Sequence, residues 1–168
     1  DSVPAMLAAD AKAAIVGPDG AREVAIADLM TGPGQTSLVR GELVTAIVLP
    51  IPPARSGDAY LRFIPRTEMD IAVVGAGVSV TLNADGTCAA ARLALGAVGP
   101  TVKLVEAASS VLVGNKLDDA TLNALAEAAS AACSPIDDKR GTAEFRTNVA
   151  GVLARRAAAI AWQRAENN

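Results

Sequence analysis

The side chains available for chemistry are restricted, because this 168-residue sequence contains no histidine. Without histidine there is no Ser-His or Cys-His nucleophile pair, no imidazole metal ligand and no imidazole general base. Any chemistry must therefore use carboxylates, arginine or lysine side chains, or a bound cofactor. The composition argues against a self-sufficient hydrolase.

Charged residues gather in two short runs. The first, Arg66 to Asp70, is either a loop beside a bound group or a charged turn held by ion pairs, and the residues leave both interpretations open. The second surrounds an expected helix start and comprises Asp137, Asp138, Arg140, Glu144 and Arg146. Acids and arginines in that position cap a helix and pair with one another, so we expect a structural role. No pattern brings two carboxylates together in a pocket, which disfavours an independent acid–base enzyme.

A glycine-containing stretch, Val73 to Val80, resembles a dinucleotide-binding fingerprint at first sight. That fingerprint needs a strand, a glycine-rich turn and then a helix whose first turn meets the pyrophosphate. Here Val80 occupies the third glycine position, and strict alternation continues into an Asn83–Gly86 turn. We therefore expect a β-strand with small residues on a packed face.

Composition excludes several other classes of function. The net charge is −3 and aromatic residues make up 2% of the chain, so a nucleic-acid partner is not expected. No apolar run reaches the roughly 18–20 residues of a membrane span. The two cysteines, Cys88 and Cys133, are too few and too far apart for a disulfide framework or a thiolate cluster, which favours a reducing cytoplasm. Because Asp1 is not a methionine and no signal-peptide pattern follows, we expect the sequence to start inside a longer protein.

The first third of the chain predicts a small, mostly β unit. Ser2 to Asp10 reads as a short helix capped by Ser2, and Lys12–Val16 with Arg22–Ile26 reads as a hairpin. Glu42 to Leu49 is apolar on both faces, so we expect it to lie inside a sheet. Prolines at 50, 52 and 53 then interrupt the pattern, and we place a domain boundary there, between residues 1–55 and 56–168.

The remainder predicts an antiparallel meander followed by three helices. Strands are expected at 59–64, 71–82 and 87–98, with small residues on the second face of the middle strand. Thr101 is expected to cap the first helix, Asp118 the second, and the third is expected to run from about Thr142 to Arg164. Three strands followed by three helices indicate an α+β fold, with the helices on one face of the sheet. Because the apolar residues are mostly Ala, Val and Leu, the elements must approach closely.

Four stretches in the same order resemble the flavin-binding (medium) subunits of molybdenum hydroxylases, the carbon monoxide and xanthine dehydrogenase family. They are LVRGELVTAIVLP at 38–50, YLRFIPRTEMDIAVV at 60–74, ALGAVGPT at 94–101 and PIDDKRGTAEFR at 135–146. The likeness covers essentially the whole chain. It implies the end of an FAD-binding subdomain followed by a three-stranded antiparallel sheet packed with three helices.

The resemblance also implies a cofactor and three contacts to it. Asp1 falls where a carboxylate accepts hydrogen bonds from the adenosine end of FAD, Val44 where an apolar side chain lies near the isoalloxazine, and Arg62 where a lysine commonly approaches the flavin ring. A cation there would stabilise reduced flavin, which tends to be anionic. Each residue also has a plainer interpretation: Asp1 as a helix-initiating acid, Val44 as core and Arg62 as an ion-paired strand residue. The glycine-rich loops that hold the pyrophosphate in the family normally come earlier than these residues.

The function implied is electron relay. In this family a large subunit carries the molybdenum cofactor and a small subunit carries 2Fe-2S clusters, and FAD passes electrons to an external acceptor. The implied assembly is a heterohexamer of two heterotrimers. The 66–70 run would then be a loop near the flavin edge. A rival hypothesis is a cofactor-free scaffold domain that docks partner subunits through its C-terminal helices, with the isolated fragment inactive.

Overall fold

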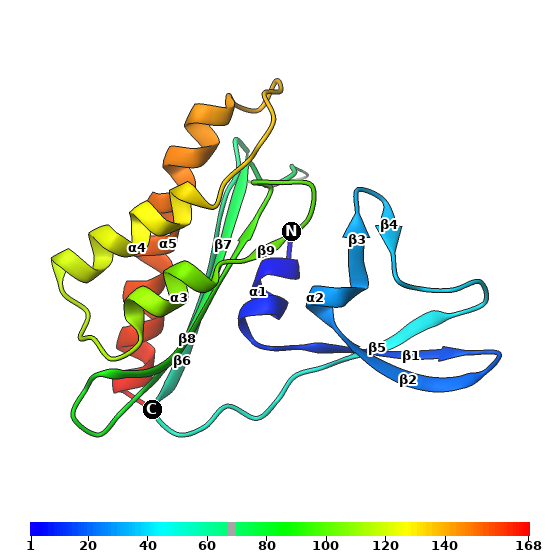
Figure 1. Ribbon diagram of the computed structural model, residues 1–168, viewed down its shortest axis with the longest axis horizontal. Coiled ribbons are helices and arrows are strands. Elements are labelled where there is room, and N and C mark those ends of the chain that lie inside the picture. Colours follow the sequence, from blue (N-terminus) through cyan, green and yellow to red (C-terminus); the bar gives the residue numbers. More distant parts are fainter. Residues whose placement is uncertain (67–69) are drawn as a thin grey trace.

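The structure is a computed structural model that describes residues 1–66 and 70–168. A long antiparallel sheet carries helices on both faces, and a smaller sheet extends away from it (Figure 1). The elements in chain order are α1 (Val3–Ala8), β1 (Lys12–Gly17), β2 (Gly20–Ala25), α2 (Ile26–Leu29), β3 (Met30–Gly32), β4 (Gln35–Thr36), β5 (Leu43–Val48), β6 (Ser56–Phe63), β7 (Val74–Leu82), β8 (Cys88–Gly96), β9 (Lys103–Leu104), α3 (Glu106–Leu112), α4 (Asp119–Ala131) and α5 (Ala143–Glu166). The predicted α+β class is confirmed.

The smaller sheet has the strand order β2–β1–β5. β1 and β2 form the predicted hairpin, with Lys12 opposite Ala25 and Gly17 opposite Gly20. β5 pairs with the other side of β1. A separate pair of very short strands, β3 and β4, lies on either side of the Gly-Pro-Gly connection at 32–34.

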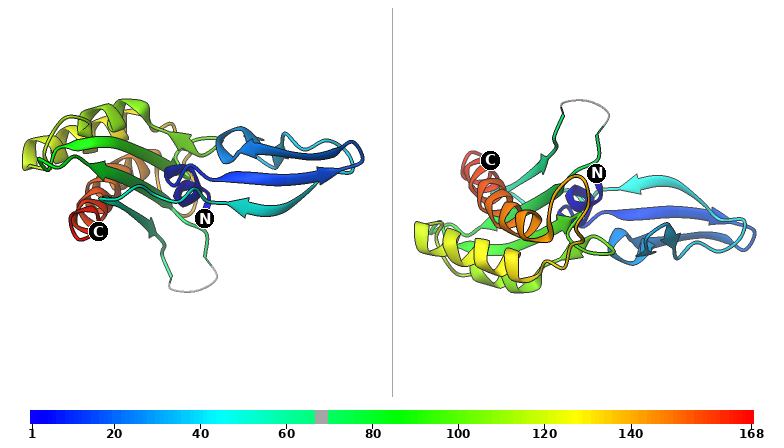
Figure 2. Two further views of the ribbon diagram at one scale, coloured as in Figure 1. Left: turned by 90° about the horizontal axis from the view of Figure 1, so that it is seen from below. Right: turned by 90° about the horizontal axis from the view of Figure 1, so that it is seen from above.

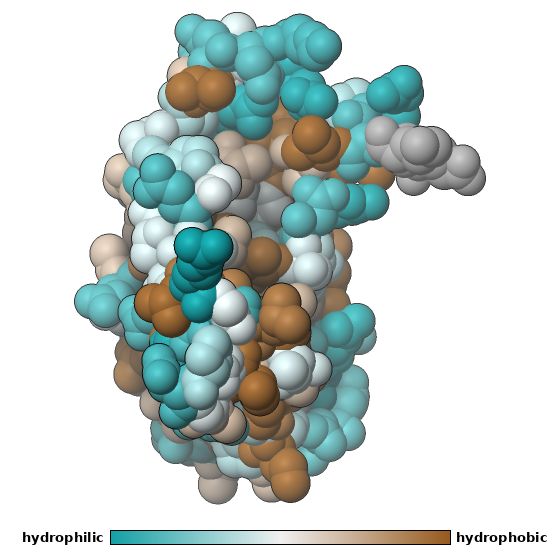
Figure 3. Space-filling view, turned by 90° about the vertical axis from the view of Figure 1, so that its right-hand side faces the viewer, coloured by the Kyte–Doolittle hydropathy of each residue, from teal (hydrophilic) through white to brown (hydrophobic). Residues whose placement is uncertain are grey.

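β5 is an edge strand, so the prediction that 42–49 lies inside a sheet is wrong. Within the described residues β5 pairs with β1 alone, and all six of its residues are exposed. Leu43 is 72% exposed and Val44 is 39% exposed. An apolar pattern on both faces indicates that both faces are suited to burial, but it does not say which part of a protein would cover them. Apolar side chains accordingly gather in a band at this end of the molecule (Figure 3).

The larger sheet has four strands in the order β6–β7–β8–β9, one more than predicted. The additional strand, β9, falls where the sequence predicts the first helix after Thr101, and that helix start is wrong. Lys103 and Leu104 pair with the edge of β8, and the Val105 N–H donates to the Leu93 carbonyl at 2.8 Å. These main-chain groups find their partners on the sheet edge, so α3 begins only at Glu106.

β7 is the central strand, and it confirms the expectation for 73–80. Its residues are extended and paired on both sides, with β6 and β8, so they do not form a phosphate-binding turn. α1 packs on the face that carries the small residues, opposite the side covered by α3, α4 and α5 (Figure 2). A β-carbon on Gly77 would lie 2.5 Å from the Pro4 carbonyl oxygen, which explains why this face must be small.

The other face of the sheet is covered by an alanine-rich helix, α5. Its inward residues are fully buried: Ala150, Ala154, Ala157, Ala158, Ala161 and Ala165. The backbone of α5 also approaches the backbones of β6 and α4 closely. A β-carbon on Gly57 of β6 would lie 2.5 Å from the Ala165 nitrogen, and one on Gly151 would lie 2.9 Å from the Ala126 carbonyl oxygen of α4. The core of small side chains is packed by bringing backbones together, as the composition predicts.

Helix starts follow local side-chain chemistry in two of the three clearest cases. The Asp118 side chain accepts a hydrogen bond from the Thr121 N–H at 2.7 Å, which confirms the predicted cap of α4. Thr142 accepts from the Phe145 N–H at 3.1 Å and begins α5. Ser2 stands at the predicted N-cap position of α1 but makes no capping hydrogen bond through its side chain.

Candidate functional site

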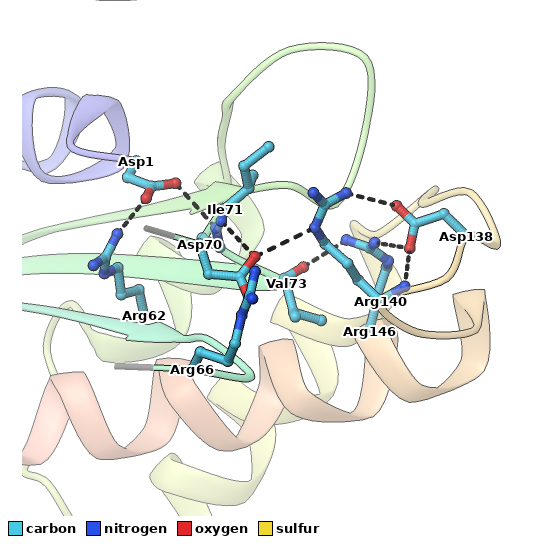
Figure 4. A network of polar contacts seen from close by, with 10 residues as sticks. Asp1, Arg62, Arg66, Asp70, Ile71, Val73, Asp138, Arg140 and Arg146 are labelled. Atoms are coloured by element: carbon cyan, nitrogen blue, oxygen red, sulfur yellow. Dashed lines mark hydrogen bonds and ion pairs between the residues drawn. The ribbon is translucent and has the colours of Figure 1, made fainter. Parts of the chain in front are cut away.

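Asp1 and Arg62, which are 61 residues apart in sequence, form an ion pair at the junction of α1 and β6 (Figure 4). One carboxylate oxygen, Oδ2, meets the Arg62 guanidinium. The other, Oδ1, accepts a hydrogen bond from the Ala72 N–H at 3.1 Å. Both charged side chains remain about one-third exposed, at 34% and 37%. The pair is therefore preformed yet open to a ligand.

Alternation along β6 positions the two contacts of Asp1. Tyr60 and Arg62 are two residues apart and share one face of the strand, and the Tyr60 hydroxyl donates to the Asp1 carbonyl. Opposite Arg62 on β7 stands Gly75, where a β-carbon would lie 2.8 Å from the Tyr60 hydroxyl. Burial raises the pKa of Tyr60 above its ordinary value of 10.0, partly offset by the Arg62 charge, so the phenol keeps its proton at neutral pH.

Val44 lies elsewhere. It stands on β5 of the smaller sheet, opposite Ile15 of β1, with its side chain partly exposed. The structure thus brings two of the three sequence-predicted residues into contact and places the third on a separate sheet.

The first charged run contains an ion pair. Arg66 Nε lies 3.1 Å from Asp70 Oδ2, and Arg140 Nε lies 3.6 Å from Asp70 Oδ1. The hydrogen bond from Arg66 lowers the pKa of the Asp70 carboxyl below its usual value. The Asp70 side chain is only 8% exposed. Thr67, Glu68 and Met69 lie outside the described residues. The expected ion pairing is therefore observed for Arg66 and Asp70, while proximity to a flavin stays a prediction.

The second charged run has the structural role expected for it. Asp137 accepts from the Ala143 N–H at the start of α5. Asp138 Oδ1 lies 2.6 Å from Arg146 Nη2, and the pKa of Asp138 is lowered by the Arg140 N–H and then by Arg146. Arg146 is 4% exposed and donates from Nη1 to the Val73 carbonyl at 2.7 Å.

Two contacts around this site do not follow from the sequence pattern. Tyr60 was recognised only as part of a motif, and the reach of Arg146 to Val73 spans 73 residues. A period-2 reading of β6 would have placed Tyr60 beside Arg62. No local signal could have paired Arg146 with Val73.

Among residues 1–66 and 70–168, no group of three or more acidic or cysteine side chains is arranged to hold a metal ion. In the same ranges, none of the helices combines the length and the apolar character needed to cross a bilayer.

Comparison with known families places both parts of the chain. Residues 59–161 match the family described as CO dehydrogenase flavoprotein C-terminal domain, and residues 1–52 match the family described as FAD binding domain in molybdopterin dehydrogenase. The chain therefore belongs to the family of FAD-binding medium subunits of molybdenum hydroxylases and corresponds to the C-terminal part of such a subunit.

Individual relatives agree with this assignment. The chain is 41% identical over 153 residues to the carbon monoxide dehydrogenase medium chain of Afipia carboxidovorans, covering 91% of this chain and 52% of that one. It is 32% identical over 150 residues to the xanthine dehydrogenase FAD-binding subunit of Escherichia coli O157:H7, covering 89% and 51%. The chain thus spans about half the length of these relatives.

A solved structure shows the same arrangement of elements. Reconstituted CO dehydrogenase from Oligotropha carboxidovorans superposes with a TM-score of 0.91 at 38% identity, covering 98% of this chain and 57% of that chain. Quinoline 2-oxidoreductase from Pseudomonas putida 86 gives a TM-score of 0.88 at 30% identity, with coverage of 98% and 56%.

Proposed function

We propose that this chain forms one side of the FAD site in the medium subunit of a molybdenum hydroxylase, and that the subunit relays electrons from iron–sulfur clusters through FAD to an external acceptor. The observation that carries the proposal is the Asp1–Arg62 pair, because it assembles a carboxylate and a cation from distant parts of the chain on an open surface.

The residues present fit a flavin. Among the described residues, the hydrogen bonds of Arg62 use Nη1, so the rest of its planar fork is available to a ligand. Its fixed charge would stabilise the anionic reduced form of the flavin, although a fork contacts a ring differently from a lysine ammonium. Because Asp1 is paired with Arg62, it would accept hydrogen bonds from the same part of the cofactor that Arg62 contacts rather than from the far, adenosine end, and Val44 offers an apolar contact. When bound, FAD supplies the redox chemistry by taking up two electrons.

The wider assembly is also a proposal. A large subunit with the molybdenum cofactor and a small 2Fe-2S subunit would complete a heterotrimer, two of which would form a heterohexamer in the cytoplasm. The boundary between residues 1–55 and 56–168 is supported by the change from one sheet to the other after β5. No general acid or base is required of this chain, which agrees with its lack of histidine.

The competing hypothesis is a scaffold without cofactor. The expected docking surface was the C-terminal helices, but the observation that favours a scaffold lies on β5, whose exposed apolar side chains suit burial against another polypeptide. The two hypotheses predict different visible absorption spectra. A visible spectrum of the purified 168-residue chain would show flavin absorption if these residues suffice. We expect a colourless chain that becomes yellow when the half present in its relatives before Asp1 is added. A colourless protein in both cases would support the scaffold.

Arg62 provides the sharper test in the flavin-loaded subunit. Arg62→Gln should lower the midpoint potential of the flavin, because a positive charge that favours the reduced anion is removed. Arg62→Lys should keep the midpoint potential close to that of the wild type, because the positive charge is retained. The matched control is Arg155→Gln. Arg155 lies on α5 and pairs with the exposed Asp119 of α4 at 3.1 Å. An unchanged potential in Arg62→Gln would exclude the proposed contact.

A further inference from the structure

The loop before α5 is tied to the segment that enters β7. Within this loop Asp138 and Gly141 form a two-bond turn, with N–H to carbonyl distances of 3.1 and 3.2 Å. From the turn, Arg140 reaches Asp70 at 3.6 Å and Asp138 at 3.9 Å (Figure 4). Asp70 is thus connected across the surface to an element that begins about 70 residues later in the chain.

The three residues after Asp70 are each held through their main chain. The Ile71 N–H donates to Asp70 Oδ1 at 2.9 Å. The Val73 N–H donates to the Phe63 carbonyl at 2.8 Å, and the Val73 carbonyl accepts from Arg146 at 2.7 Å. Ala72 lies between these two anchored residues. Its N–H is therefore held in place from both sides.

The Ala72 N–H is the contact that orients the carboxylate of Asp1. Because Ala72 occupies Oδ1, the second oxygen, Oδ2, faces Arg62. A displacement of the 70–72 backbone would turn the carboxylate and move the guanidinium with it. Polar contacts, joined by the backbone between Ile71 and Ala72, thus lead from the α5 loop to the cation at the site (Figure 4).

We propose that Arg140 is a positioning residue for Arg62: it holds Asp70 through the oxygen that Arg66 does not contact, thereby fixes the Ala72 N–H, and through Asp1 fixes the guanidinium. The flavin-related part of this inference rests on the proposed function. Arg146 anchors the other side of Ala72, but it is buried, so its removal would disturb the fold. The Arg140 side chain is 29% exposed, so it can be replaced without opening the core.

The first test needs no flavin. In the subunit that contains this chain, Arg140→Gln should speed amide hydrogen exchange at Ala72 by roughly fivefold. It should also shift and broaden the Arg62 Nε–H resonance in nitrogen-edited NMR spectra. Arg155→Gln, which removes an arginine from a more exposed ion pair, should change neither. Arg140→Lys should give an intermediate result, because it keeps the charge and loses the planar fork.

The second test uses the flavin-loaded subunit. Arg140→Gln should lower the midpoint potential by part of the shift caused by Arg62→Gln, and the double variant should match Arg62→Gln alone, because Arg140 acts through Arg62. Additive shifts, or normal Ala72 exchange and an unchanged Arg62 resonance in Arg140→Gln, would overturn the inference. A loss of thermal stability with both signals unchanged would also overturn it.

The two proposals fail in different ways. If the subunit binds no flavin, or if Arg62→Gln leaves the potential unchanged, the flavin role of Arg62 is wrong. The exchange and NMR measurements still decide whether Arg140 positions Arg62.

Discussion

Gly57 of β6 and Ala165 of α5 approach so closely that a β-carbon on the glycine would lie 2.5 Å from the alanine nitrogen. The C-terminal turn of the longest helix therefore rests directly on the backbone of the sheet. At such a distance neither backbone can be moved cheaply, because both belong to hydrogen-bonded elements.

Gly57→Ala should consequently destabilise the protein by about 3 kcal/mol, the upper part of the range for overpacking. Chemical unfolding followed by the fluorescence of Trp162, which is the only tryptophan and lies on α5, would measure it. Gly32→Ala is the matched control, since the nearest atom there is the end of the Gln35 side chain at 3.2 Å. Equal effects in the two variants would contradict the close approach.

The cap of α4 can be tested separately. Asp118→Ala removes the acceptor of the Thr121 N–H and should cost about 1 kcal/mol of unfolding free energy. The adjacent Asp119 pairs with Arg155 on the surface and its side chain is 90% exposed, so Asp119→Ala should cost less than about 0.5 kcal/mol. Urea titrations of both variants would provide the comparison, and a larger loss in Asp119→Ala would show that the cap contributes little.

Arg146→Met should destabilise the fold by about 2–3 kcal/mol, because it leaves the Val73 carbonyl and the Asp138 carboxylate without their buried partner. The expected loss is below that of a fully buried pair, since Asp138 is 29% exposed. Thermal unfolding of Arg146→Met beside Arg155→Met would measure it. The idea fails if the two variants melt together.

Acid should expose the contribution of Glu42. Hydrogen bonds from Arg22 and from the Val39 N–H lower the pKa of Glu42 from 4.5 to about 2. A carboxyl whose pKa is lower in the folded state stabilises the protein above its unfolded pKa, and this contribution is lost as the pH falls through the folded pKa. Glu42→Gln should therefore melt below wild type at pH 7, and the difference should shrink between pH 4.5 and about 2.

The control for this pH dependence is Glu23→Gln. Glu23 pairs with Lys12 at 3.7 Å with both side chains more than half exposed. Its melting difference should be small at every pH. A Glu42→Gln difference that persists unchanged in strong acid would contradict the lowered pKa.

Elements with a local signal were predicted well. The turn at Asn83–Gly86, the alternation on either side of it and the cap at Asp118 each involve residues within a few positions of one another. The same holds for the small residues on β7, whose face is covered by α1. Local chemistry decides these features, so the sequence suffices.

Features that depend on distant partners were predicted poorly. A short strand at 103–104 forms because the edge of β8 offers it a partner, although Thr101 looks like a helix cap. β5 is apolar on both sides yet lies at an edge. At the site, Asp1 and Arg62 were identified through a family resemblance, whereas the contacts of Arg140 and Arg146 depend on the folded chain.

The open margin of β5 affects how the chain behaves at high concentration. Among residues 1–66 and 70–168 no strand pairs with its outer edge, so its N–H and carbonyl groups, flanked by side chains such as Leu43 and Ile47, offer a template to which another extended polypeptide can add. We therefore expect aggregation of this chain to depend on this one strand more than on the stability of the well-packed helical layer. A preparation can be fully folded by spectroscopy and still precipitate.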